Sequence, residues 1–134
     1  MLLPNVPAMY EAHFGVPMSG AVLNTINTRL DARTVAVLLR HSGSRLVFVD
    51  PVLVALLDDA LCLLPPEHPA PRVVLVEDPQ EKDFPPAPAA ALTYERLLEM
   101  GDPELKWDSA DDTQLHIRHH VGTQRDRALP QRHL

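Results

Sequence analysis

Large aromatic side chains are scarce in this sequence. The 134 residues include one Trp, two Tyr and three Phe, although 46% of the residues are hydrophobic. The apolar residues are therefore mainly Leu, Val and Ala, and the length suffices for one modest domain with a core of its own. We expect a core of aliphatic side chains.

The single cysteine, Cys62, excludes a disulfide bond within the chain. It lies in the apolar run LLDDALCLL, where we expect a buried and unreactive thiol. Apolar runs of membrane-spanning length are also lacking, and the start MLLPNVPAMY has no basic leader and contains two prolines, so it does not resemble a signal peptide. These absences favour a soluble intracellular protein.

Positive charge is scarce in most of the chain. Up to Leu115 there are eight Lys and Arg against 17 Asp and Glu, whereas the rest of the chain has four Arg and one Asp. An acidic body is not typical of nucleic-acid binding. A short basic run is more often a solvated segment than a binding arm, so we expect no nucleic-acid partner.

The patterns of the commonest nucleotide and hydrolase sites are missing as well. The chain contains no GxGxxG, no GxxxxGK[ST] and no GxSxG. These patterns place backbone N–H groups around phosphates or expose a nucleophilic serine. From its residues alone, the sequence therefore predicts no catalytic, cofactor-binding or metal-binding residue.

Helical and extended segments alternate along the first hundred residues. We predict helices over 7–16, 32–43, 51–64 and 92–101, and strands over 20–26, 45–50 and 72–78. This order is typical of βαβ units, and the prediction is an α/β fold with a partial, doubly wound parallel sheet of three strands and about four helices. Three strands leave open sheet edges, which suggests part of a larger sheet.

Local signals predict how the helices begin and end. Asn5, Asp31 and Thr93 are placed to cap three of them, and Gly43 suits the left-handed position after the second. Pro17 and Gly20 are expected to end the first helix. The side chains that we expect to be buried by the first two helices are Met9, Phe14, Val16, Val35, Leu38 and Leu39.

The histidines of the tail form the most conspicuous candidate for a metal site. His116, His119 and His120 would share one face of a helix, which is suitable spacing for zinc. The segment contains Gly122, lacks an apolar stripe and has no Cys or Glu to complete the set. We therefore interpret the cluster as fortuitous, and we assign no role to the other histidines.

Four polar residues follow predicted strands. Asp50 and Asp78 stand at the carboxyl ends of two strands, where open α/β sheets place ligands, although each also fits a turn or helix cap. Asn27 and Arg29 either contact a substrate or hold a loop through hydrogen bonds to the backbone. The structural role is the expectation for all four.

One long stretch resembles a known family. Residues 5–50, NVPAMYEAHFGVPMSGAVLNTINTRLDARTVAVLLRHSGSRLVFVD, combine Asn5-x-Pro7, Gly20-Ala21-Val22, Asn27-x-Arg29-Leu30 and RLVFVD. This pattern resembles the N-terminal region of adenylate-forming (AMP-binding) acyl-CoA synthetases, and in particular the plant acyl-activating enzymes, relatives of coumarate–, benzoate– and cinnamate–CoA ligases. The resemblance continues through VVLVEDP and LTYERLLEMGDPE and covers about residues 3–106.

The resemblance implies an acid–thiol ligase fold and chemistry. Such enzymes use Mg and ATP to convert a carboxylic acid to an acyl-adenylate, and then transfer the acyl group to coenzyme A. Their phosphate loop, approximately Tyr-Thr-Ser-Gly-Thr-Thr-x-x-Pro-Lys-Gly, is absent here, as are the family's later segments. We therefore expect residues 1–106 to be an inactive N-terminal fragment of the adenylation domain, with no bound cofactor of its own.

The tail is compatible with that loop in another reading frame. Synonymous codons can be chosen for 114–134 so that dropping the first base yields Asn-Tyr-Thr-Ser-Gly-Thr-Thr-Ser-Ala-Pro-Lys-Gly. The codon choice is a construction, but Gly122 and Thr123 leave little freedom in it. We interpret 107–134 as a disordered tail translated out of frame, after a frameshift, a mis-spliced junction or an error in the gene's reading between Trp107 and Asp112.

An alternative from another class is a non-catalytic interaction module. The open sheet edge would pair with a full-length relative. A basic-tailed or metal-binding protein is the third reading. The resemblance also implies a cytoplasmic or peroxisomal location, and we interpret the terminal Arg132-His133-Leu134 as a coincidental likeness to a peroxisomal signal.

Overall fold

The computed structural model of the chain describes residues 1–77, 92–102, 104 and 117–119. The elements in chain order are α1 (Pro7–Met18), β1 (Leu23–Thr25), α2 (Ala32–Ser42), β2 (Leu46–Val49), the 3₁₀ helix η1 (Pro51–Leu53), α3 (Val54–Cys62), β3 (Arg72–Leu75), α4 (Tyr94–Glu99) and β4 (Ile117–His119). Over these residues, no helix is both long and apolar enough to cross a membrane.

The strand pairs formed by the described residues are all parallel. β2 pairs with β3, with Val47 opposite Val73, and β1 pairs with β4, with Leu23 opposite Ile117. A single parallel bridge joins Leu2 to β2, and another joins Thr93 to β3. Parallel strands connected through helices confirm the predicted α/β class.

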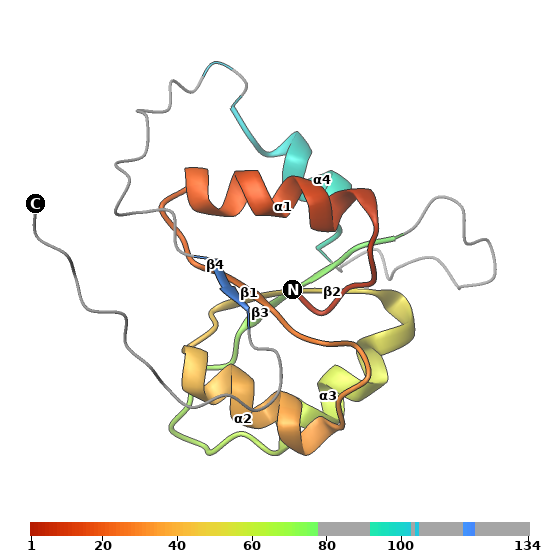
Figure 1. Cartoon of the computed structure of the whole chain (residues 1–134), viewed down its shortest axis with the longest axis vertical. Helices are drawn as coiled ribbons and strands as arrows, with labels where there is room; N and C mark the ends of the chain where they lie inside the picture. The colour runs from red at the N-terminus through yellow and green to blue at the C-terminus, as the bar shows by residue number, and fades with distance from the viewer. Residues whose placement is uncertain (78–91, 103, 105–116, 120–134) are drawn as a thin grey trace, which may run out of the picture.

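Helices cover both sides of the β2–β3 pair. In Figure 1, α1 and α4 lie above the strands and α2 and α3 lie below them. Side chains alternate along β2, so Val47 and Val49 pack in one cluster while Phe48 packs against the other. This arrangement, with helices on two sides of a parallel sheet, agrees with the doubly wound architecture.

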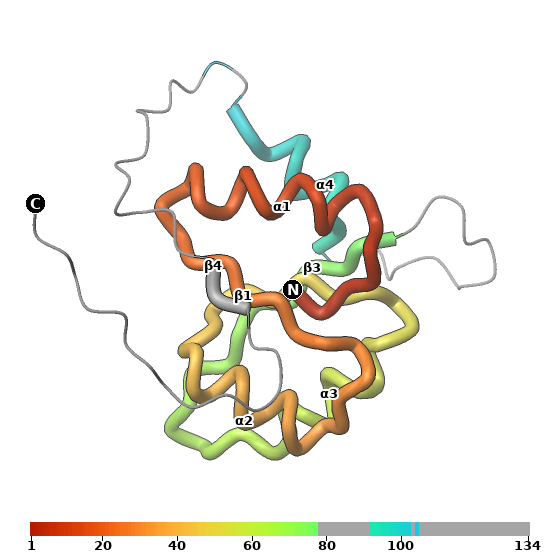
Figure 2. The backbone as a smooth tube through the Cα atoms, in the orientation of Figure 1, coloured from red at the N-terminus to blue at the C-terminus, as the bar shows by residue number. Residues whose placement is uncertain are grey.

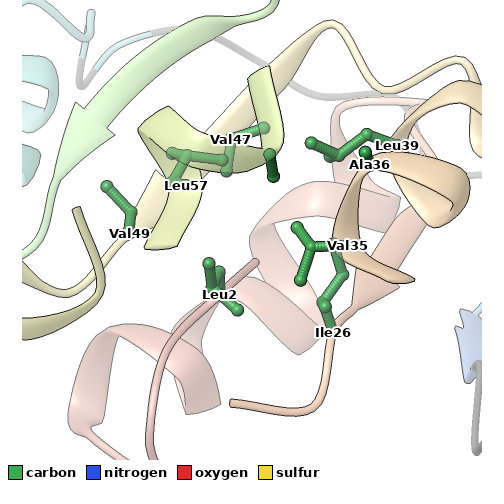
Figure 3. Close-up of a cluster of buried hydrophobic side chains, with 9 residues drawn as sticks. Leu2, Ile26, Val35, Ala36, Leu39, Val47, Val49 and Leu57 are labelled. Carbon is green, nitrogen blue, oxygen red and sulfur yellow. The ribbon is translucent and has the colours of Figure 1, made fainter. Parts of the chain in front are cut away.

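The cluster under α2 and α3 is aliphatic throughout. Figure 3 shows its side chains converging from α2, α3, β2 and the N-terminus. Its buried members are Leu2, Ile26, Val35, Ala36, Leu39, Val47, Val49, Leu57 and Ala60. The second cluster, on the α1 side, contains Met1, Leu3, Ala8, Met9, Ala12, Leu23 and Val76. Neither has a buried ring, as the composition predicted.

The predicted ends of two helices are confirmed. The Asp31 carboxylate accepts a hydrogen bond from the Thr34 N–H at 2.7 Å, and Thr93 Oγ1 accepts one from the Arg96 N–H at 3.3 Å. Gly43 follows α2 with φ 62°, a left-handed conformation that glycine adopts without steric cost. These helix ends could be predicted because capping depends on residues close together in the sequence.

The prediction for α1 was wrong at three residues, one of which is Pro17, which lies inside the helix instead of ending it. Asn5 does not cap the helix, because the N-cap is Val6, which provides no side-chain hydrogen bond. Phe14 is 55% exposed. The inner face of α1 buries Ala8 and Ala12, and two residues further along a helix the side chain has turned by about 200°.

The thiol of Cys62 is exposed, which corrects the expectation of a buried cysteine. The buried residues of α3 are Leu57 and Ala60. Cys62 follows Ala60 by two positions and therefore faces away from the core. An apolar neighbourhood in the sequence does not identify which side of a helix faces the core.

The strands also differ from the prediction in their arrangement. The sequence predicted three strands, whereas the described residues form four, and β1 pairs with β4 rather than with β2. The three residues of β4 are too few to show a periodic pattern. The remainder of the predicted disordered tail, and the predicted loop 80–91, lie outside the described residues.

Candidate functional site

A groove of about 750 Å³ lies among α1, α4, β1 and the start of β2. We call it the α1–α4 groove. Figure 2 shows α1 and α4 on the same side of the strands. Its lining residues are Met1, Glu11, Ala12, Gly15, Val16, Ser19, Ala21, Val22, Leu23, Asn24, Ser42, Gly43, Ser44, Arg45, Leu46, Phe48, Tyr94, Leu97 and Leu98.

Helical spacing explains which side chains of α1 and α4 line the groove. α1 contributes residues 11, 12, 15 and 16, which recur at intervals of three and four and so share one face, and Ser19 follows its end. α4 contributes Tyr94, Leu97 and Leu98 with the same spacing. Gly15 has no side chain, and a Cβ atom added there would meet nothing within 4 Å. The groove is therefore open at the middle of α1.

The two walls are joined by a hydrogen bond. The Tyr94 hydroxyl donates to the Glu11 carboxylate, and the Tyr94 ring contacts Phe48 edge-on with centroids 6.1 Å apart. Burial of the phenol, followed by the bond to Glu11 and its negative charge, raises the pKa of Tyr94 to about 12. The phenol is therefore a hydrogen-bond donor at neutral pH.

Polar groups gather at the β1 end of the groove. Ser42 Oγ and Ser44 Oγ are 2.7 Å apart, and Asn24 Nδ2 donates to Ser44 Oγ at 3.4 Å. The Asn24 Oδ1 atom is buried and has no hydrogen-bond partner among the described residues. An acceptor in this state favours a partner that supplies an N–H or O–H group.

The N-terminus closes the same end. The Met1 α-amino group donates to the Asn24 backbone carbonyl at 2.7 Å. Burial lowers the pKa of this amino group to about 6, because the charged form loses its hydration. The amine is thus largely neutral at pH 7.

Asp50 and Asn27 have the structural roles that the sequence favoured. Asp50 is 5% exposed, and its carboxylate accepts a hydrogen bond from the Val52 N–H at 2.9 Å, which caps η1. Asn27 Oδ1 accepts from the Arg29 N–H at 2.9 Å and holds the turn before α2. None of these residues lines the groove. Asp78 lies outside the described residues.

The structure describes only one of the three histidines of the predicted tail cluster. His119 belongs to β4, an extended segment, so the helical spacing assumed for a zinc site does not apply to it. His116 and His120 lie outside the described residues. Within the part that the structure describes, no group of three His, Cys, Asp or Glu side chains is placed to hold a metal ion.

The groove itself was not predicted from the sequence. Glu11 and Tyr94 are 83 residues apart, and no local pattern links them. Its lining, as far as the structure describes it, includes neither histidine, lysine nor cysteine. Aliphatic walls with a small polar end are suited to binding.

Comparison with known proteins gives the family. The model of the AMP-binding enzyme family matches residues 1–117. The chain is 46% identical over 115 residues to 2-methylpropanoate–CoA ligase CCL4 of Humulus lupulus, a match that covers 80% of this chain and 20% of that ligase. It is 51% identical over 104 residues to probable acyl-activating enzyme 10 of Arabidopsis thaliana, with 78% and 19% covered.

A third relative is the peroxisomal butyrate–CoA ligase AAE11 of Arabidopsis thaliana, 48% identical over 107 residues that cover 77% of this chain and 18% of that ligase. The chain thus spans about a fifth of the length of the curated relatives that it matches. These findings confirm the resemblance to plant acyl-activating enzymes. Since the family model covers 117 of the 134 residues, the chain belongs to the AMP-binding enzyme family.

Proposed function

We propose that this chain is the N-terminal scaffold portion of an ATP-dependent acid–CoA ligase, and that its 134 residues alone do not form an acyl-adenylate. The observation that supports the proposal most directly is its 46% to 51% identity to CoA ligases and acyl-activating enzymes over one segment of about a fifth of their length. ATP, Mg, coenzyme A and a carboxylic acid are then ligands of the whole enzyme.

The expected inactivity has a physical reason. Transfer of an acyl group onto a nucleotide phosphate requires donors for the phosphate oxygens, usually backbone N–H groups of a glycine-rich loop and a lysine. The chain contains no Ser-Gly-Thr-Thr-x-x-Pro-Lys-Gly pattern. Without such donors the charge that develops in the transition state is not stabilised.

Pyrophosphate release tests the proposal. The purified chain is incubated with Mg and ATP, with butyrate or 2-methylpropanoate as the acid, and the Arabidopsis butyrate–CoA ligase serves as the positive control. We expect acid-dependent release to equal that of the blank without protein. Reproducible release above the blank would show that this chain has adenylation chemistry of its own.

We also propose that 107–134 is translated out of frame. The family match ends at residue 117, so the last 17 residues lie beyond it, which supports the proposal for 118–134 but not for 107–117. Sequencing the transcript across the codons of Trp107 to Asp112 should show a template whose neighbouring frame encodes the phosphate loop. A template that encodes no such loop in either neighbouring frame would contradict the proposal.

A second candidate function is an interaction module that pairs with a full-length relative through a sheet edge. The β2–β3 pair is extended on each side by a single bridge only, which supports this candidate. Co-purification of this chain with an intact acyl-activating enzyme is the test. Absence of the complex at micromolar concentrations would exclude it.

The location proposed for the protein is the cytoplasm or the peroxisome. The names of two relatives, butyrate–CoA ligase AAE11 and probable acyl-activating enzyme 5, include the word peroxisomal. A fluorescent protein fused to the N-terminus, imaged beside a peroxisomal marker, distinguishes the two compartments. Fluorescence confined to the secretory pathway would contradict both.

A further inference from the structure

We propose that the outer face of α2 binds an acidic amphipathic helix of a partner protein. The partner helix lies antiparallel to α2, places one carboxylate on Arg33 and another on Arg40, and packs an aliphatic side chain between them. α2 lies on the opposite side of the β2–β3 pair from α1 and α4 (Figure 1). This interaction goes beyond the proposed function, because it involves neither a nucleotide nor a carboxylic acid substrate.

Positive charge is concentrated around α2. Residues 29–45 contain four of the eight Lys and Arg found up to Leu115, together with one Asp and no Glu. That residue is Asp31, whose carboxylate accepts the Thr34 N–H at 2.7 Å to cap the helix. Hydrogen bonds from Thr34 are the largest causes of its lowered pKa, and the charge of Arg33 is the smallest. The surface around α2 is therefore basic within an otherwise acidic body.

A hollow of about 420 Å³ lies on this basic surface. It is lined by Arg33 and Arg40, by Ala36 and Val37 between them, and by residues 63–65, and none of these residues is acidic. We call this lining the α2 basic face. Val37 and Leu63 are aliphatic but remain 50% and 57% exposed. An apolar floor between two cations complements a partner that has an apolar centre between two anions.

The spacing of these residues favours a helix as the partner. Arg33, Val37 and Arg40 occupy positions i, i+4 and i+7 of α2 and so lie along one stripe. Seven residues of a helix rise about 10 Å, so an antiparallel helix matches the stripe with acidic residues at i and i+7 and an aliphatic residue at i+3. In an extended peptide, residues about 10 Å apart point to opposite faces.

The antiparallel orientation follows from the charges at the end of α2. Arg40 and His41 lie in its last turn, and the helix dipole makes this end partially negative. An antiparallel partner places its own partially positive N-terminus beside this end, with an acidic residue of its first turn next to Arg40. Exposed ion pairs are individually weak, so the arginines set register and orientation while the apolar contacts supply most of the affinity.

The test measures the binding of two labelled helical peptides to the purified chain by fluorescence anisotropy, each of about 18 residues. The matched peptide carries Glu, Leu and Glu at i, i+3 and i+7 in an alanine- and glutamine-rich sequence. The shifted peptide has the same composition, but its second Glu is moved to i+5, on another side of the helix. We expect the matched peptide to bind about fivefold more tightly.

Three arginine variants locate the binding surface. Arg33→Gln and Arg40→Gln each remove one cation from the α2 basic face, and each should weaken binding of the matched peptide about fivefold. Arg29→Gln is the matched control, because Arg29 does not line the hollow and its backbone N–H still donates to Asn27 Oδ1. It should change the affinity by less than about twofold. Leu63→Ala should weaken binding about threefold through loss of apolar contact.

Equal affinity for the two peptides would overturn the proposal, because only net charge would then be recognised. An effect of Arg29→Gln as large as that of Arg33→Gln would overturn it too, as would the absence of saturable binding of the matched peptide. Sedimentation with phosphatidylserine vesicles tests another class of partner, and binding of vesicles without binding of peptide would assign the face to a membrane surface instead. All of these readouts are independent of pyrophosphate release.

Discussion

Tyr94 of α4 donates a hydrogen bond to Glu11 of α1, and so connects two helices that are 83 residues apart in the sequence. Both residues line the α1–α4 groove. The contact holds the two walls at a defined separation, and the edge-on packing of Tyr94 on Phe48 attaches α4 to β2. Several measurable consequences depend on this relationship and on the packing around it.

Tyr94→Phe should lower the free energy of unfolding only slightly, and Glu11→Gln should change the pKa of Tyr94. Tyr94→Phe keeps the ring contact, and because the hydrogen bond is solvent-exposed we expect a loss of about 0.5 kcal/mol in the free energy of unfolding by urea. Glu11→Gln should lower the pKa of Tyr94 from about 12, and burial should still keep it above 10. Ultraviolet absorbance of the phenolate reports this pKa, and an unchanged value in Glu11→Gln would contradict the contact.

The raised pKa of Tyr94 determines how the free energy of unfolding depends on pH. Its pKa is raised in the folded state, so the folded protein holds the phenolic proton more tightly than the unfolded chain. The contribution to stability is complete below pH 10 and is lost as the pH rises towards 12. Urea unfolding of the parent and Tyr94→Phe at pH 9 and pH 11 should show a smaller difference at the higher pH.

The Met1 amino group should give the free energy of unfolding a second pH dependence, with the opposite sign. Its pKa falls from the usual 8.0 to about 6 on folding, so the unfolded chain binds the proton more tightly. The free energy of unfolding should therefore rise by about 2 kcal/mol from pH 6 to pH 8, and return to its lower value when the solution is acidified back to pH 6. Acetylation of the amine is the control, because it removes the titration and should remove that part of the slope.

Two glycines should respond in opposite ways to the same substitution. Gly15 lies within α1 with free space around its Cα, so Gly15→Ala should stabilise the protein by about 0.5 to 1 kcal/mol. Gly43 has φ 62°, so Gly43→Ala should destabilise it by about 1 kcal/mol. Urea unfolding of both variants measures the two values, and shifts of the same sign would contradict the backbone conformations.

Burial predicts that two leucines close together in the sequence contribute differently to the free energy of unfolding. Leu57 is 1% exposed in the cluster under α2 and α3, whereas Leu63 is 57% exposed. Leu57→Ala should lower the free energy of unfolding by about 2 to 5 kcal/mol, and Leu63→Ala should change it by less than about 0.5 kcal/mol. Similar losses in both variants would mean that α3 has a different face towards the core.

Local features were predicted well because their causes lie within a few residues. Asp31 and Thr93 cap the helices that follow them by accepting hydrogen bonds from N–H groups three residues ahead, Gly43 ends α2, and the predicted strand 45–50 contains β2. The α/β class followed from the order of these segments.

The two errors in the predicted burial share one cause. α1 and the region around Cys62 are apolar on several sides, so periodicity did not identify the inner face, and Phe14 and Cys62 were wrongly expected to be buried. The inner face of a helix can be predicted from the sequence only when the outer face is polar.

The amino-acid sequence by itself determined the family, the alternation of helices with strands and the absence of a phosphate-loop pattern, because these depend on residue identity and short-range order. Only the tertiary structure decided that β1 pairs with β4, that Glu11 meets Tyr94 and that Asn24 Oδ1 is buried without a donor from any described residue. Those relationships join residues far apart in the chain, and they exist only once packing of the two aliphatic clusters has brought the elements together.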